Sequence, residues 1–105
     1  MTINFEDRIL MCFGELIAER RHREESQQNV EVHLTDHVIN GKKCGYFLRW
    51  NTGGTLDILT TWDDVTAKMR IATLDMHQIR DFGRSLAMAV KIIILTVEEE
   101  LEDRS

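Results

Sequence analysis

The spacing of apolar residues changes twice along the chain, and this change restricts the fold more than any other feature of the sequence. Near the N-terminus, apolar residues recur at helical spacing at Phe5, Ile9, Phe13, Leu16 and Ile17. Asn4 can cap the first turn, so we expect an amphipathic helix over residues 4–27. From residue 30 to about residue 74 the period is two, which is typical of strands with one buried face.

Four strands separated by turn sequences fit this central region. We place them at residues 30–35, 44–50, 55–63 and 67–73. The pair Asn40-Gly41 is preferred in two-residue hairpin turns, because both positions of such a turn must accept a positive φ. The region therefore predicts an antiparallel meander.

The last stretch returns to helical spacing and is the longest expected element. Its apolar residues are Ile79, Phe82, Leu86, Val90, Ile93, Val97 and Leu101. We expect one helix over residues 75–103, capped by Thr73 or Asp75, with a strand over residues 91–97 as the alternative. Gly83 within this helix indicates that another backbone approaches closely there. The predicted fold class is α+β: an N-terminal helix, a four-stranded antiparallel meander and a long C-terminal helix (α-β-β-β-β-α), both helices packing on one sheet face.

Composition and charge restrict the class of protein. A chain of 105 residues, of which 43% are apolar, is expected to form a single domain over residues 1–105. The net charge of −5 arises mainly in residues 98–105, and the nearly neutral remainder does not resemble a protein that holds duplex phosphates unaided. The early acids and the absence of a long apolar run argue against a secretory signal and a transmembrane helix. We expect a cytoplasmic protein with no membrane partner and with Cys12 and Cys44 reduced.

The C-terminal helix carries a second apolar stripe beside its main one, formed by Met88, Ile92 and Leu95. One sheet face does not need both stripes, so another surface should cover the second. The N-terminal helix of the same chain and a second copy of the protein are the two candidates. Because two-fold dimers commonly bury such stripes, we predict a homodimer that uses these three residues.

Strand parity places one aromatic ring and several cations on a common sheet face: Phe47, Arg49, Lys68, Arg70 and His33. Exposed sheet surfaces of this kind hold single-stranded nucleic acid in other folds. The same face carries Glu31 and Asp57. The alternative is that the aromatic residues pack in the core or across strands and that Arg49 pairs with Asp57.

The strand order followed by Ile71-Ala-Thr-Leu-Asp75 and a helix resembles the single-strand-binding transcription coactivator domains, over residues 44–95 and without a specific motif. Those domains are dimeric four-stranded sheets with a C-terminal helix, so the resemblance implies a dimer and single-strand binding. This chain departs from that family by its long N-terminal helix and by lacking the lysine-rich strands that carry nucleic acid there.

Residues of catalytic and metal-binding types form no constellation that we can assign to a reaction. His33 and His37 are separated by about 13 Å on a strand, which is too far to share one ion. Asp63 and Asp64 fall where a turn favours aspartate. The segment Asn51–Gly54 precedes a strand and lacks the helix N-terminus that a phosphate loop needs. We therefore predict no catalytic residue, no metal and no cofactor.

Acidic residues gather at the C-terminal end of the last helix: Glu98, Glu99, Glu100, Glu102 and Asp103. Negative charge is unfavourable there because of the helix dipole, which leaves room for a basic partner. The basic cluster Arg20–Arg23 is flanked by glutamates and indicates a salt-bridged helix end. The sequence thus predicts a small non-catalytic cytosolic protein that binds a protein partner and a second copy of itself. The alternatives are a single-stranded nucleic-acid-binding protein and an acidic inhibitor, from a mobile element, of a nucleic-acid-binding machine.

Overall fold

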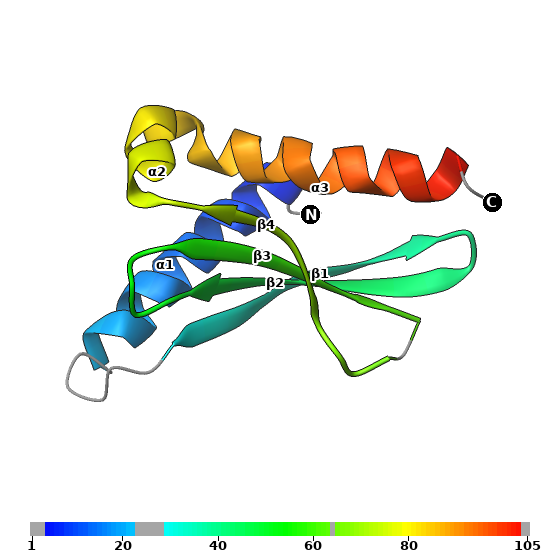
Figure 1. Ribbon diagram of the computed structural model, residues 1–105, viewed down its shortest axis with the longest axis horizontal. Coiled ribbons are helices and arrows are strands. Elements are labelled where there is room, and N and C mark those ends of the chain that lie inside the picture. The colour runs from blue at the N-terminus through cyan, green and yellow to red at the C-terminus, as the bar shows by residue number, and fades with distance from the viewer. Residues whose placement is uncertain (1–3, 23–28, 64, 104–105) are drawn as a thin grey trace.

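The computed structural model describes residues 4–22, 29–63 and 65–103, with the backbone alone at residues 20–22 (Figure 1). Its elements in chain order are α1 (Phe5–His22), β1 (Val30–Ile39), β2 (Lys42–Trp50), β3 (Leu56–Trp62), β4 (Met69–Leu74), α2 (Met76–Phe82), the short 3₁₀ helix η1 (Gly83–Ser85) and α3 (Leu86–Asp103). The four strands form one antiparallel sheet in the order β1-β2-β3-β4. The predicted α+β class and the α-β-β-β-β-α order are confirmed.

Turn chemistry explains how the strands are joined. Asn40 and Gly41 have φ of 53° and 76°, which confirms the hairpin turn predicted between β1 and β2. The turn before β3 places Gly54 at a φ of 84°, where residues with a side chain are strained. At the start of α1, the Asn4 side chain accepts a hydrogen bond of 2.8 Å from the Asp7 amide, so the predicted cap also forms.

One irregularity in β1 changes which side chains face the helices. The pairing with β2 shifts between His33 and Thr35, so that Leu34 is an extra residue at a β-bulge. The Arg8 side chain of α1 donates hydrogen bonds to the carbonyl oxygens of Leu34, at 2.8 Å, and His33, at 3.2 Å, and so holds the bulge. Beyond the bulge the alternation is reversed, and His33 and His37 lie on opposite faces of the sheet.

Both long helices cover the same face of the sheet, as predicted, and the core lies between them and the strands (Figure 1). The helix α1 contributes Ile9, Cys12 and Leu16 to this core, and α3 contributes Ala87, Val90 and Ile94. These residues recur at helical spacing and are all nearly inaccessible to solvent. The second sheet face carries Phe47 and Arg49, and none of the described helices covers it (Figure 1); we call it the open face.

The predicted long C-terminal helix is present as α3, but it begins at Leu86 and not at residue 75, because Gly83 separates it from α2. Asp75 caps α2 in a reciprocal arrangement with Gln78, as one of the two predicted caps, and α2 ends at Phe82. Gly83 then adopts a φ of 49° and a ψ of −119°, which lies far from the dihedral angles of an α-helix. A side chain placed there would meet no atom of the described chain within 4 Å, so no described backbone of the same chain approaches Gly83 closely. The alternative strand over residues 91–97 is helical.

Candidate apolar binding site

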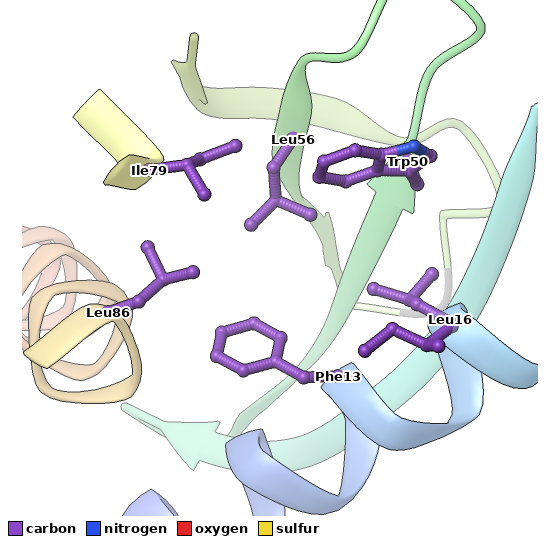
Figure 2. Close-up of a pocket in the computed structure, with 7 residues that line it drawn as sticks. Phe13, Leu16, Trp50, Leu56, Ile79 and Leu86 are labelled. Carbon is purple, nitrogen blue, oxygen red and sulfur yellow. The ribbon is translucent and has the colours of Figure 1, made fainter. Parts of the chain in front are cut away.

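The two long helices diverge over the sheet (Figure 1). An apolar cavity opens between them at the end of the sheet where β2 meets β3 (Figure 2). Its volume is about 390 Å³. Seven side chains line it: Phe13, Leu16, Ile17, Trp50, Leu56, Ile79 and Leu86. We call this space the wedge cavity.

Each element brings its residues to the wedge cavity for a local reason. The helix α1 supplies three of them from the stripe that also packs on β1. Trp50 is the last residue of β2 and Leu56 is the first residue of β3. The turn between them therefore brings both side chains to the same end of the sheet. Because Gly83 turns the chain between α2 and α3, Ile79 and Leu86 approach from two helices rather than from one (Figure 2). The cavity therefore depends on the break that the sequence pattern did not reveal.

The wedge cavity can bind apolar groups by removing them from water, but its side chains offer no acid, base or nucleophile. None of its seven lining side chains titrates in water near neutral pH. A cavity of about 150 Å³ already accommodates benzene in a protein core, and this one is more than twice as large. Ile17, with 57% of its surface exposed, lies at the mouth, and Leu10 continues the same stripe of α1 with 50% exposed. An apolar surface therefore extends from the cavity into solvent.

The predicted nucleic-acid residues do come together on the open face, but all of them that carry charge, except Arg70, are paired with a carboxylate. The rings of His33 and Phe47 meet edge to face with centroids 5.2 Å apart, and the Lys68 ammonium lies 4.3 Å from the centre of the Phe47 ring. Lys68 is paired with Glu31, and His33 Nε2 lies 2.9 Å from a carboxylate oxygen of Asp36. The ring face that a base would stack on is thus already occupied.

The two arginines of that prediction differ in their surroundings. Arg49 donates a 2.7 Å hydrogen bond to Asp57, which confirms the predicted alternative of an Arg49–Asp57 pair. Within the described part of the chain, Arg70 is exposed and has no ion pair. Burial alone would raise the pKa of Asp57, but hydrogen bonds from Asn51, Thr73 and Arg49, together with the guanidinium charge, lower it below its ordinary value.

A smaller hollow of about 260 Å³ lies on the open face next to these residues. It is lined by His33, Asp36, Lys43, Phe47, Thr61 and Val65. Lys43 Nζ lies 3.7 Å from the second carboxylate oxygen of Asp36, so one acid faces two basic groups in this hollow. Such a mixture of signs produces little net field for an anionic ligand.

The acidic group predicted at the end of α3 is divided by the fold. Glu98 points inward, where one of its oxygens lies 2.5 Å from His37 Nδ1. Beneath it, burial first and the Glu98 carboxylate second raise the pKa of Tyr46. Glu99, Glu100, Glu102 and Asp103 are exposed, while Leu101 between them is half-buried. Glu98 is therefore a structural residue and does not belong to the acidic surface.

The predicted dimer residues lie on the outer side of α3. Met88, Ile92 and Leu95 expose 39%, 55% and 37% of their surfaces. The helix α1 packs on another side of α3 and does not cover them. The alternative in which the N-terminal helix buries this stripe is therefore wrong, and the stripe is open to an outside partner.

Some predictions concern residues outside the described ranges. The side chains of Arg20–Arg23 and residue Asp64 belong to this group. Among the residues that the structure does describe, no cluster of three or more His, Cys, Asp or Glu side chains could hold a metal ion. No helix in those same ranges is long and apolar enough to cross a membrane.

The residues of the wedge cavity were predicted only as core positions of their helices and strands. The signal in the sequence was weak: Ile17 next to Leu16 widens the apolar stripe of α1 beyond what one sheet contact requires. No protein-family model, curated protein or solved structure matches this chain. The geometry of the structure is therefore the basis on which a function can be inferred.

Proposed function

We propose that the protein is a non-catalytic binding protein whose wedge cavity receives apolar side chains of a protein partner. The observation that carries this proposal is a surface cavity of about 390 Å³ lined by apolar side chains alone. Apolar side chains that line an open cavity are in contact with water, and covering them with an apolar occupant is favourable. Cavities that accept anchoring side chains are typical of the energetically dominant centres of protein interfaces.

Two features favour a protein over a small molecule as the occupant. Sites for small molecules combine an apolar lining with a few polar groups that orient the ligand, and the lining here offers only the indole nitrogen of Trp50. The exposed residues Leu10 and Ile17 extend the apolar surface beyond the cavity. A contiguous exposed patch of this kind is characteristic of protein interfaces.

The geometry suits an amphipathic helix of the partner. It would lie between α1 on one side and α2 with α3 on the other, over the floor formed by Trp50 and Leu56 (Figure 2). Such helices place apolar anchors at intervals of three and four residues into a groove. Residues 23–28, which follow α1, contain no apolar residue and therefore do not supply such anchors.

We further propose that the protein acts in the cytoplasm. Cys12 and Cys44 are both free and buried, and burial raises the pKa of each thiol. Unreactive reduced thiols of this kind suit a reducing compartment.

The test uses Trp50 as a reporter, in a Trp62→Phe background that leaves it as the only tryptophan. Anilinonaphthalene sulfonate is titrated in, and energy transfer from Trp50 to the bound dye is measured. We expect saturable binding that Ile17→Lys at the mouth weakens at least tenfold. Met11→Lys is the matched control, because Met11 is 45% exposed on α1 but does not line the cavity.

The same pair of variants tests the protein partner. The parent and both variants are cross-linked in cell extract, and the captured proteins are compared. A partner retained by Met11→Lys and lost by Ile17→Lys supports the proposal. Dye binding that is equal in all three proteins, or an equal loss in both variants, would show that the wedge cavity is not the binding site.

A further inference from the structure

A line of residues along the outer side of η1 and α3 changes from basic through apolar to acidic. Its members are Arg84, Met88, Ile92, Leu95 and Glu99. They follow one another at intervals of four, four, three and four residues, so they share one side of the helix. All five are exposed. We call this line the outer seam.

No described part of the chain pairs with the charges of the outer seam or covers its apolar residues. Neither Arg84 nor Glu99 has an ion pair among the described residues, and the three apolar residues face solvent. The two charges also oppose the dipole of α3, which favours anions at the N-terminal end and cations at the C-terminal end. An outside surface with its charges in the reverse order would pair with Arg84 and Glu99 and would also offset their unfavourable interaction with the helix dipole.

The order of the residues makes the outer seam complementary to itself. Met88 and Leu95 lie four residues before and three residues after Ile92, while Arg84 and Glu99 lie eight before and seven after it. At 1.5 Å per residue, the two charges are therefore about 11–12 Å from Ile92 on either side. A two-fold axis at Ile92 would place Met88 opposite Leu95 of the partner and Arg84 opposite Glu99 of the partner.

We infer that α3 pairs in antiparallel orientation with α3 of a second copy of this chain, through the outer seam. Charge complementarity selects a second copy over another protein, because one helix supplies both the cation and its matching anion. The antiparallel orientation also sets the two helix dipoles in opposition, so that each charged residue approaches the favourable end of the other helix. A surface that contacts the same surface of its copy is the usual arrangement of a two-fold dimer.

The dimer goes beyond the proposed function, because it leaves the wedge cavity open. Leu86, which lines that cavity, is two residues before Met88 and thus lies about 200° around the helix from it. A dimer would therefore present two wedge cavities that point away from the shared helices. Failure of one proposal leaves the other standing, since they use different sides of α3.

The first test measures mass by light scattering coupled to size-exclusion chromatography. We expect a dimer for the parent protein and a monomer for Ile92→Asp, whose helical circular dichroism and melting profile stay close to those of the parent because Ile92 is 55% exposed. A parent protein that is monomeric at every accessible concentration would overturn the inference.

The second test examines the orientation through charge reversal. Arg84→Glu and Glu99→Arg each place like charges opposite one another at both ends of the interface, and we expect each to weaken the dimer about tenfold. The double variant Arg84→Glu/Glu99→Arg should restore the parent affinity. Glu100→Arg is the matched control, since it makes the same charge change one residue outside the outer seam.

Mixing the two single variants provides the sharpest outcome. One chain then carries two acids and the other two arginines at the seam positions, so the mixture should form heterodimers at parent affinity. A double variant as weak as the single ones, together with no heterodimer in the mixture, would contradict an antiparallel pairing of α3 with its own copy.

Discussion

The Tyr46 hydroxyl is buried and has no hydrogen-bond partner among the residues that the structure describes, which is unusual for a polar atom inside a protein. A buried hydroxyl without a partner costs about 1–3 kcal/mol of desolvation. We therefore expect Tyr46→Phe to leave the free energy of unfolding unchanged or to raise it by about 1 kcal/mol. Urea denaturation followed by circular dichroism measures this difference.

Thr60→Val is the comparison for this prediction, because the Thr60 hydroxyl does donate a hydrogen bond, of 2.9 Å, to the carbonyl of Gly45. It should lower the stability by about 1 kcal/mol. If Tyr46→Phe were the more damaging of the two, the neighbouring Glu98 would have to accept a hydrogen bond from the phenol in solution.

Asp57 provides a pH-dependent contribution to stability. It is 2% exposed, accepts a 2.7 Å hydrogen bond from Thr73, and has a lowered pKa in the folded protein. A lowered folded pKa stabilises the protein above the unfolded value of about 3.9, and that stabilisation is lost as the pH falls through the folded value. Asp57→Asn should therefore be less stable at pH 7 by about 1–3 kcal/mol and should lose less stability between pH 5 and pH 2.

Thermal melts of parent and variant over that pH range measure the effect. Asp103→Asn, an exposed acid at the end of α3, is the control and should follow the parent. Parallel melting curves for parent and Asp57→Asn at every pH would contradict the assignment of a lowered pKa to Asp57.

At the scale of elements, Gly83 decides where α2 ends and α3 begins. Its φ of 49° with a ψ of −119° is a conformation that residues with a side chain rarely adopt. Gly83→Ala should lower the free energy of unfolding by about 1–3 kcal/mol. Gly14→Ala in the middle of α1 should raise it by about 0.5–1 kcal/mol, because a methyl group there meets nothing and alanine favours the helix. Equal effects of the two substitutions on urea denaturation would show that Gly83 is not strained.

The elements also show which parts of the fold were predictable. The periods of the apolar residues and the Asn40-Gly41 pair act locally, so they predicted the element order and the first turn. The bulge at Leu34 was not predictable, because it is held by Arg8 from a distant helix. The break at Gly83 was missed because the apolar residues continue at helical spacing across it.

At the scale of the whole molecule, the compensated charges of the open face lead to a prediction about nucleic acid. Lys68, His33 and Arg49 are paired with carboxylates, so few phosphate contacts remain available. We expect no salt-dependent binding of single-stranded or duplex oligonucleotides in a low-salt titration followed by anisotropy and tryptophan fluorescence. Micromolar binding that weakens steeply with salt, and that Arg49→Glu with Arg70→Glu abolishes, would instead support the sheet-face alternative.

The wedge cavity is formed by several elements together, and for this reason the sequence did not predict it. Phe13 and Leu86 have the pattern of ordinary core residues, and only the angle between their helices leaves a space between them (Figure 2). The three residues predicted for a dimer do lie together on the surface, because helical spacing determines which residues share one side of a helix. A helix pattern predicts its own faces and contains no information about how far away the next helix lies.

The contacts that fasten the end of α3 to the β1–β2 hairpin have a consequence for how the chain is made. His37 bonds to Glu98 and Asn40 bonds to the carbonyl of Leu101, and each pair is separated by 61 positions in the chain. The helix α3, which closes the core, is thus synthesised only after the whole sheet. Until it emerges, the sheet has been synthesised with much of its apolar face uncovered. We therefore expect the nascent chain to be prone to aggregation through that face until α3 has emerged.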